Sequence, residues 1–420
     1  MGTRPSSIVF APDGVVTLGR RLTCGAFAVD IDDERVSREH ATVRWQHDGW
    51  RIVDLGSRNG TFVDGERLRG ERHVEADAVV RLGHTVLVLL RDGRGHGATK
   101  AARGELVIGP GVARADDEIR RAAGGRTLLL QGESGVGKER SARLFHDARR
   151  PDGPFVAVDC AAIPEGAAER LLFGSRRGAF SGATDAVGHL QSADGGTLFL
   201  DQIAELDLGV QAKLLRVLET REVLPIGATS PIAIDLGVVA ATHVDLRAVP
   251  RTHFREDLYD RLAHAVVRIP PLRERKVDAA RLAVAELASI DGRLSAHAKL
   301  VEACCVRMWP GNVRELRTAV ARAARTALAD HRLVVRAADL PEHAGAARDD
   351  PPGVVAPEPP PIDLGPPLEQ ARLQHRRELD ESDVRAVMAE HGDNLTAAAR
   401  AAGIDRSTLD RLLRRFGIRT

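Results

Sequence analysis

The sequence predicts a multidomain protein: an all-β sandwich, then an α/β domain, then an all-α helix-turn-helix. Residues 1–92 carry short alternating apolar stretches divided by Gly, Asp and Asn turns, which is typical of a small sandwich. Between about 106 and 340, predicted strands alternate with helical segments, as in α/β proteins. Residues 368–420 return to helical periodicity after a proline-rich segment.

A chain of 420 residues is too long for one ordinary core, so several domains are expected. Residues 349–367 hold eight of the 21 prolines and form an extended linker that cannot build a core. With a formal net charge of +1, no global field draws the protein to DNA or membrane. No apolar run approaches the roughly 18 residues of a membrane span, and no signal peptide is visible. We therefore expect a cytoplasmic protein that makes no contact with a membrane.

Three short clusters in the first domain are rich in hydrogen-bond donors: Gly19–Arg20, SREH at 37–40 and GSRNGT at 56–61. They combine guanidinium, hydroxyl and amide groups with few acids, which suits a phosphate carrying a charge of about −1.5 to −2. Any one cluster alone could simply be a hairpin turn.

In their order and spacing, the three clusters resemble a forkhead-associated (FHA) domain, a reader of phosphothreonine peptides, here assigned to 1–95. The resemblance implies a phosphothreonine-containing protein or peptide as partner, and a structural role for His40 in bracing the loop. It implies a phosphopeptide site formed by Arg20, Ser37, Arg38, Arg58 and Asn59.

The segment LLLQGESGVGKE at 128–139 reads as a strand that runs into a glycine-rich loop. Its glycines let backbone N–H groups face a phosphate, and Lys138 can reach the β- and γ-phosphate oxygens. The residue after this lysine is Glu139 rather than Ser or Thr, so the strict P-loop pattern is broken.

Further motifs follow in a fixed order, among them LLFGSRRGAFSGA, GGTLFLDQI, IPPLRER and WPGNVREL. With the glycine-rich loop they resemble the AAA+ domain of sigma-54-dependent transcription activators, the NtrC-type bacterial enhancer-binding proteins. That family also carries an acid at the position of Glu139. The resemblance implies an α/β nucleotide-binding subdomain over 106–270 and a helical lid over 271–343. The proline-rich linker, which the composition predicts, is assigned to 344–367.

The resemblance also implies ATP and Mg²⁺ as ligands, with Asp201 holding the metal, Thr242 as sensor I and Arg314 as sensor II. Arg255 and Arg261 match arginine fingers that act on a neighbour's ATP, in a ring that is hexameric in this family. Six residues apart, both can serve one phosphate only if the first lies at a loop or helix start. The implied nucleotide-binding residues are Gly132, Glu133, Ser134, Gly135, Val136, Gly137, Lys138, Glu139, Thr242 and Arg314.

The segment GAFSGA at 178–183 corresponds to the loop that touches sigma-54 in this family. Flexible glycines flank an apolar aromatic residue, and a serine replaces the usual threonine. The implied contact residues are Gly178, Ala179, Phe180, Ser181, Gly182 and Ala183.

One pair departs from the family pattern: the usual Asn and Glu are replaced by Asp159 and Gln202. An amide cannot take a proton from water, so Gln202 cannot be a general base. The pair reads as an exchange of amide and carboxylate, and we hypothesise that Asp159 supplies the missing charge near the attacking water. Loss of chemistry in a ring that only binds ATP is the alternative. The expected catalytic set is Asp159, Asp201, Gln202, Arg255 and Arg261.

Residues 394–418 show two apolar stripes at helical spacing with Gly403 between them, as a helix-turn-helix requires. Over 394–420, six Arg stand against two Asp, so this segment is basic although the whole chain is nearly neutral. The segment resembles the Fis-type DNA-binding domain, here assigned to 368–420. A helical hairpin with a solvated basic face is the simpler reading. The residues expected on double-stranded DNA are Arg406, Ser407, Thr408, Arg411 and Arg414.

The favoured function is a phosphothreonine-controlled activator that binds upstream DNA and uses ATP to remodel sigma-54 RNA polymerase. The alternative is a phosphopeptide-regulated DNA-binding protein whose AAA+ ring binds ATP without productive hydrolysis. An ATPase scaffold outside transcription is a third reading, which the Fis-like segment disfavours.

Overall fold

The computed structural model describes residues 14–22, 28–91, 110–164, 166–179 and 184–346, together with Met388, Ala398, Ala399 and Leu413. The chain divides into two compact units, Met1–Arg348 and Asp349–Thr420. Apart from Ala398, Ala399 and Leu413, the predicted helix-turn-helix lies outside the described residues, and so do all of its predicted DNA-facing residues. Within the described ranges, no helix is long and apolar enough to cross a membrane.

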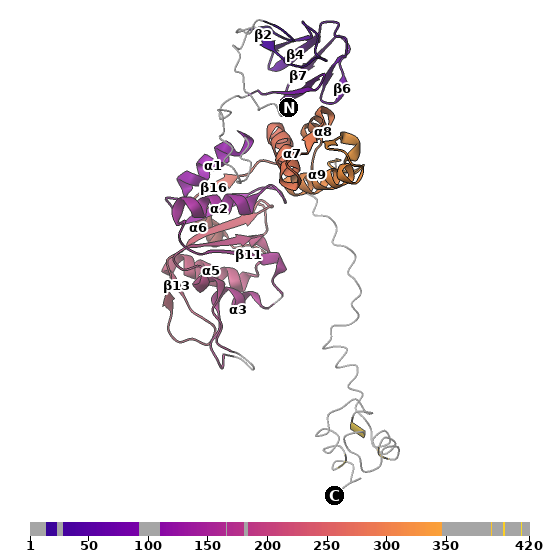
Figure 1. Cartoon of the computed structure of the whole chain (residues 1–420). Helices are drawn as coiled ribbons and strands as arrows, with labels where there is room; N and C mark the ends of the chain where they lie inside the picture. Colours follow the sequence, from indigo (N-terminus) through magenta and orange to yellow (C-terminus); the bar gives the residue numbers. More distant parts are fainter. Residues whose placement is uncertain are drawn as a thin grey trace. The chain divides into compact units, whose positions relative to one another are not determined.

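The amino-terminal domain is the β-sandwich that the alternating pattern predicts (Figure 1). Its first sheet has the order β2-β1-β3-β4-β7, with bounds Ala28–Asp30, Val16–Gly19, Ala41–Gln46, Gly49–Asp54 and Glu71–Val74. The second has the order β6-β5-β8-β9, with bounds Glu66–Arg67, Thr61–Val63, Ala78–Leu82 and Thr85–Leu89. Alternate residues such as Val43, Ile52 and Val80 fill the core between the two sheets.

The α/β subdomain is built on a five-stranded parallel sheet in the order β11-β12-β15-β10-β16. The strands span Phe155–Asp159, Thr197–Asp201, Gly237–Thr242, Thr127–Gln131 and Val266–Arg268. A hairpin of β13 and β14, Glu222–Val223 and Ile232–Ala233, stands outside this sheet. Since all five strands run in one direction, their carboxyl ends meet at one edge, where ligands of open α/β sheets bind.

Helices cover both faces of this sheet (Figure 1). Leu128 and Leu130 point to one face, where α1 and α2 complete an apolar core, while Leu129 points to the core shared with α3, α5 and α6. Burial on both faces explains why these strands read as continuous apolar runs. The helices are α1 Pro110–Ala122, α2 Lys138–Arg149, α3 Ala168–Phe173, α4 His189–Ser192, α5 Leu208–Thr220 and α6 Glu256–Leu262. Short 3-10 turns are η1 Cys160–Ala162 and η2 Ile203–Glu205.

The lid is a helical domain around its own core, which includes Leu300, Trp309, Leu316 and Val320. Trp309 is completely buried, and its indole Nε1 donates to the Cys304 carbonyl oxygen at 2.8 Å. The lid consists of η3 Leu272–Glu274, α7 Lys276–Ile290, β17 Ser295–Ala296, α8 Ala298–Val306, α9 Asn312–Ala329, β18 Val334–Val335 and η4 Ala337–Asp339.

Candidate nucleotide and phosphopeptide sites

The glycine-rich loop joins β10 to α2 at the carboxyl edge of the central sheet. Lys138 is the first residue of α2 and only 8% exposed, with Nζ 3.0 Å from Gly132 O and 3.1 Å from Glu133 O. Burial lowers the pKa of Lys138, the charge of Asp201 opposes that shift, and Arg314 adds to it. The Lys138 ammonium therefore lies inside the glycine-rich loop, where it could pair with an anion that binds there.

The geometry of this loop fits a polyphosphate. Gly135 and Gly137 have φ of +75° and +108°, values that a residue with a side chain rarely adopts. No side chain among the described residues caps the first N–H groups of α2, so they remain available to an anion. A Cβ added to Gly135 would lie 2.3 Å from Gly311 O and 3.2 Å from Arg314 Cβ. The lid therefore brings Arg314 beside the loop.

Asp201 lies at the carboxyl end of β12, with Asp159 opposite it at the end of β11. The two strand ends place a pair of carboxylates next to Gln202, whose Nε2 lies 3.4 Å from Asp159 Oδ1. Gln202 has φ of +55° and ψ of +49°, an uncommon conformation for a residue other than glycine. Asp159 Oδ1 also accepts from Ala161 N at 3.1 Å, which fixes the carboxylate at the sheet edge.

The carboxylate at Asp201 suits Mg²⁺, which is commonly held by one or two carboxylates together with phosphate oxygens and waters. Within the described ranges, no group of three or more His, Cys, Asp or Glu residues forms a metal cage. A metal at this edge would therefore depend on the nucleotide for most of its ligands.

Glu133, predicted as part of the nucleotide-binding loop, directs its side-chain carboxylate toward the lid. Both oxygens of Glu133 accept from Arg273, at 2.6 and 2.8 Å, and Asn312 Nδ2 donates to it at 3.1 Å. The hydrogen bonds from Arg273 lower the pKa of Glu133 most, partial burial opposes them, and Asn312 reinforces them. Arg273 and Asn312 were missed as site residues, although both lie in the quoted motifs IPPLRER and WPGNVREL.

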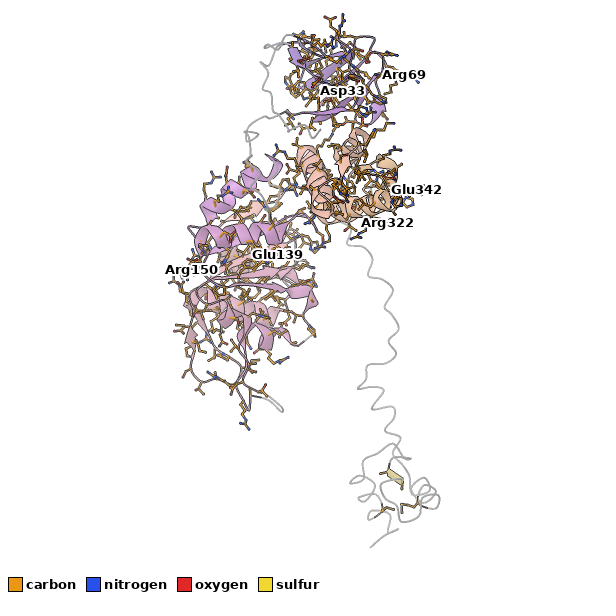
Figure 2. All side chains as sticks on the ribbon, viewed as in Figure 1. Asp33, Arg69, Glu139, Arg150, Arg322 and Glu342 are labelled. Atoms are coloured by element: carbon orange, nitrogen blue, oxygen red, sulfur yellow. The ribbon has the colours of Figure 1, made fainter. Side chains whose placement is uncertain are left out.

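Two further predicted nucleotide-site residues, Thr242 and Glu139, lie on β15 and α2. Thr242 is the last residue of β15 and is almost fully buried. Its hydroxyl forms hydrogen bonds with the backbone O and N of Val244. Glu139 lies on the exposed surface of α2 (Figure 2), where it pairs with Arg143.

The two predicted arginine fingers lie at opposite ends of α6. Arg255 immediately precedes the helix and pairs with Asp257 through its Nε and Nη2 atoms, at 3.0 and 2.7 Å. Arg261 lies in the last turn and donates to the Leu218 carbonyl oxygen at 3.2 Å. The first finger thus lies at a helix start, the arrangement that their spacing required.

The predicted sigma-54 contact loop is described only in part. Gly178, with φ of +86°, and Ala179 are described, whereas Phe180, Ser181, Gly182 and Ala183 lie outside the described residues. The segments on either side are held together, since Ser175 and Ala186 exchange backbone hydrogen bonds of 2.9 Å.

In the sandwich, the loops that carry the three donor clusters converge on one hollow of about 710 Å³. Hydrogen bonds join these loops: Arg58 N donates to Ser37 Oγ at 3.2 Å, and Asn59 Nδ2 donates to Arg35 O at 2.7 Å. All five predicted phosphopeptide residues line this hollow: Arg20, Ser37, Arg38, Arg58 and Asn59.

Two details of this hollow fit an anionic ligand. Arg20 Nε is buried and has no hydrogen-bond partner among the residues that the structure describes. Gly19 permits the close approach of the loops, because an added Cβ would lie 1.9 Å from Arg38 O. Among the described residues, the Nε–H donor of Arg20 is therefore left unpaired, and it could bind an anion.

His40 braces the loop, as the FHA resemblance implied. It is completely buried, its Nδ1 accepts from Ser37 N at 3.0 Å, and its Nε2 lies 3.3 Å from Gly60 O. Burial lowers the pKa of His40, which favours the neutral ring that these two roles require.

Asp54 organises the third donor cluster from the end of β4. Its carboxylate accepts from the backbone N and the hydroxyl of both Ser57 and Thr61, and from Gly56 N, at 2.6 to 3.0 Å. Burial alone would raise the pKa of Asp54, but the bonds from Thr61, Ser57 and Gly56 outweigh it and lower the pKa to about 2. The loop that carries Arg58 and Asn59 is thus tied to an ionised carboxylate.

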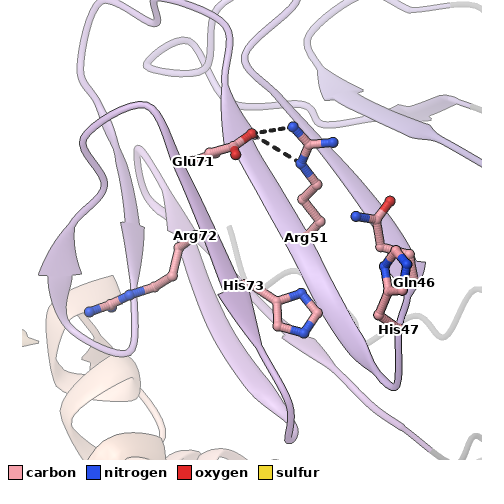
Figure 3. A pocket seen from close by; sticks show the side chains of 6 residues that line it. All are labelled: Gln46, His47, Arg51, Glu71, Arg72 and His73. Atoms are coloured by element: carbon pink, nitrogen blue, oxygen red, sulfur yellow. Dashed lines mark hydrogen bonds and ion pairs between the residues drawn. The ribbon is translucent and has the colours of Figure 1, made fainter.

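A second hollow in the sandwich, of about 390 Å³, is lined by Gln46, His47, Arg51, Glu71, Arg72 and His73 (Figure 3). Here the guanidinium of Arg51 is already paired with Glu71. Its cation is neutralised within the domain, which distinguishes this hollow from the one beside Arg20.

Family comparisons divide the chain as the fold does. Residues 16–83 match the FHA domain, 111–268 match the sigma-54 interaction domain, and 273–354 match the AAA+ ATPase lid domain.

Curated relatives share the central region. The chain is 41% identical over 314 residues to the nitric oxide reductase transcription regulator NorR2 of Cupriavidus necator, covering 69% of this chain and 58% of the relative. It is 38% identical over 310 residues to the Nif-specific regulatory protein of Azotobacter vinelandii, covering 71% and 56%. The chain thus spans little more than half the length of these relatives.

Solved structures of NtrX from Brucella abortus, in complex with ATP and with ADP, are similar to this chain at TM-scores of 0.51 and 0.52. Each is 29% identical, and the two alignments cover 75% and 74% of this chain and 70% of each NtrX chain. The domain matches and these relatives point to the same central region. The chain therefore carries an FHA domain, followed by a sigma-54 interaction domain and an AAA+ ATPase lid domain, and it is similar to transcription regulators over the last two.

Proposed function

We propose that this protein is a phosphothreonine-controlled transcription activator that uses ATP to remodel sigma-54 RNA polymerase. The observation that carries the proposal is that Lys138 and Asp201 lie at one edge of the sheet of a sigma-54 interaction domain, while Arg314 of the lid lies beside the same glycine-rich loop.

ATP would bind with its phosphates on the first turn of α2 and on Lys138. Mg²⁺ held by Asp201 would neutralise phosphate charge there. Arg314 adds a cation from the lid, so the bound nucleotide would join the two subdomains. Arg255 of a neighbouring subunit would complete the site in a ring, which is hexameric in the related family.

Phosphothreonine control is proposed from the hollow beside Arg20, whose spare buried donor and neighbouring cations suit a phosphate. DNA binding is proposed from the basic segment at 394–420, which would hold the protein upstream of a promoter.

A second function is favoured by one specific observation, the amide at Gln202. With that amide in place of a carboxylate, the protein would be a phosphopeptide-regulated DNA-binding protein whose ring binds ATP without productive turnover. We favour the activator because Asp159 places a carboxylate beside the same amide, at 3.4 Å.

The test is ATP-dependent transcription from a supercoiled template with a sigma-54 promoter, using the full-length protein and sigma-54 RNA polymerase. We expect transcripts that require hydrolysable ATP and disappear in Lys138→Ala. ATP binding without turnover or transcripts would instead establish the second function.

A further inference from the structure

The outer face of strand β8 is buried where a sandwich strand would normally meet solvent. Ala78, Val80 and Leu82 point into the sandwich core, so Val79 and Arg81 point outward. Nevertheless Val79 is 0% exposed and Arg81 only 6% exposed. Helix α8 of the lid packs against β8 and β9 and covers this face.

Charged groups pair across this contact. Arg81 Nε donates to Glu302 Oε2 of α8 at 2.6 Å, and both side chains are at least nine-tenths buried. Lys276, the first residue of α7, donates through Nζ to Asp64 Oδ1 at 3.2 Å and to Asp77 O at 2.8 Å. A buried charge is retained only when it is paired, so the FHA face and the lid are electrostatically matched.

The same FHA face is tied to the proposed phosphopeptide site through Asp33. Its Oδ1 accepts from Arg35 N at 2.9 Å, in the loop that carries Ser37. Its Oδ2 accepts from His84 N at 2.6 Å, in the turn between β8 and β9. The His84 ring meets the His297 ring of the lid edge-on, with centroids 5.5 Å apart.

On the lid side, α8 is connected to the glycine-rich loop. The Cys304 carbonyl of α8 holds the Trp309 indole at 2.8 Å. The Trp309 carbonyl in turn accepts from Asn312 N at 2.7 Å, and Asn312 Nδ2 donates to Ser134 O at 3.0 Å. One series of packed and hydrogen-bonded groups therefore joins the phosphopeptide loops to the ATP loop.

We propose that the FHA domain docks on lid helix α8 through Arg81, Asp64 and His84, and that phosphopeptide binding loosens this contact and thereby changes nucleotide affinity. The coupling half of the proposal rests on the phosphothreonine function proposed above. A peptide that takes the Asn59 amide and the Ser37 hydroxyl removes their bonds to Arg35 O and Arg58 N. The loop held by Asp33 then loses its internal support.

The chemistry of the contact suits a reversible interface. Glu302 Oε1 is buried without a hydrogen-bond partner in the part of the chain that the structure describes. An incompletely satisfied buried ion pair adds little net stability, although it strongly penalises a mismatched charge. The interface is therefore specific and easily opened.

The test is zero-length carbodiimide crosslinking of the full-length protein, followed by peptide mass spectrometry. Docking predicts an isopeptide bond between Lys276 and Asp64, whose charged atoms are 3.2 Å apart. The ion pair of Lys213 with Glu169, inside the α/β subdomain, supplies an internal control for the chemistry. If the control link forms and the link between Lys276 and Asp64 does not, docking is overturned.

Charge variants make the test specific. Arg81→Glu should lower the yield of the Lys276–Asp64 link about tenfold or more, since it places two carboxylates together in a dry contact. Arg81→Glu combined with Glu302→Arg should restore it. The control Arg51→Glu, which breaks an exposed ion pair on the other sheet, should leave it unchanged. Equal yields in Arg81→Glu and wild type would overturn the proposal.

Coupling is tested with a labelled phosphothreonine peptide that fluorescence anisotropy has shown to bind. Saturating peptide should lower the crosslink yield ~5-fold or more. By reciprocity, ATP should change peptide affinity by the same factor as peptide changes ATP affinity. A bound peptide that leaves the crosslink unchanged overturns the coupling. Failure of every peptide to bind overturns the phosphothreonine function instead, and leaves the docking result standing.

Discussion

The Gln202 side-chain amide donates to the Asp159 carboxylate across the ends of two adjacent parallel strands, with 3.4 Å between Nε2 and Oδ1. At this distance the hydrogen bond is long, and the left-handed backbone of Gln202 holds the amide in position. The structure thus joins the two departures from the family pattern into one pair, in which the carboxylate comes from β11.

If Asp159 supplies the charge near the attacking water, Asp159→Asn leaves two amides and should lower ATP turnover by roughly 10²–10⁴-fold. Adding Gln202→Glu to that variant returns a carboxylate to the pair and should recover turnover. Both are measured on the full-length protein, with Lys138→Ala as baseline and nucleotide binding checked separately. Wild-type turnover in Asp159→Asn would rule out this role for Asp159.

Arg255 should act on the ATP of a neighbouring subunit, although it is paired with Asp257 in its own chain. Arg255→Ala should lower turnover by ~10³–10⁵-fold while ATP binding is kept. Mixing Arg255→Ala with Lys138→Ala subunits should restore part of the turnover, because the second variant supplies intact fingers to the intact ATP sites of the first.

The matched control for the finger is Arg251→Ala, which removes an exposed arginine paired with Glu256 and should keep near-wild-type turnover. Mixtures no more active than the sum of the separate variants would show that Arg255 does not act between subunits.

The alternation of apolar residues, and of strands with helices, was enough to predict the sandwich and the α/β domain. The spacing of donors and glycines marked the loops around Lys138 and Arg20, since those features are local in sequence. It was not enough to orient Glu133, whose partners Arg273 and Asn312 lie well over a hundred residues away in the lid. Nor could the alternation of apolar and polar residues along β8 reveal that Arg81 is buried, because the lid helix α8 that covers it lies more than 200 residues further along the chain.

Arg20 should carry much of the affinity for a phosphothreonine peptide. Charge-assisted bonds to a phosphate contribute about 1.5–3 kcal/mol each, so Arg20→Ala should weaken binding at least ~10-fold. The measurement is peptide titration by calorimetry, with an unphosphorylated peptide and Arg51→Ala as controls. Undiminished affinity in Arg20→Ala would remove phosphate recognition from this hollow.

The pKa of Asp54, lowered to about 2, predicts how the sandwich responds to acid. Because the pKa of Asp54 is lower in the folded state, its ionisation stabilises the fold at pH values above the unfolded-state pKa of about 3.9. This stability is lost as the pH falls toward 2. Denaturant midpoints followed by Trp45 and Trp50 fluorescence should therefore fall from about pH 5 to pH 2. Asp54→Asn should flatten that fall, and the exposed control Asp32→Asn should not.

Asn312 should be the residue whose loss most directly separates the lid from the ATP loop. It is completely buried, its Oδ1 accepts from Leu272 N at 2.8 Å, and its Nδ2 donates to both Glu133 and Ser134. Removing the amide leaves buried groups unpaired at about 1–3 kcal/mol each, so Asn312→Ala should lower both unfolding free energy and ATP affinity.

The backbone of Asn312, with φ of +52°, allows these lost bonds to be separated from conformational strain. Asn312→Gly loses the same hydrogen bonds but adopts that φ freely, whereas Ala resists it by about 1 kcal/mol. Urea unfolding should therefore rank wild type above Asn312→Gly and Asn312→Gly above Asn312→Ala, with equally weakened ATP binding in both variants. If Asn312→Gly binds ATP as tightly as wild type, the amide does not hold the loop, and only the left-handed turn does.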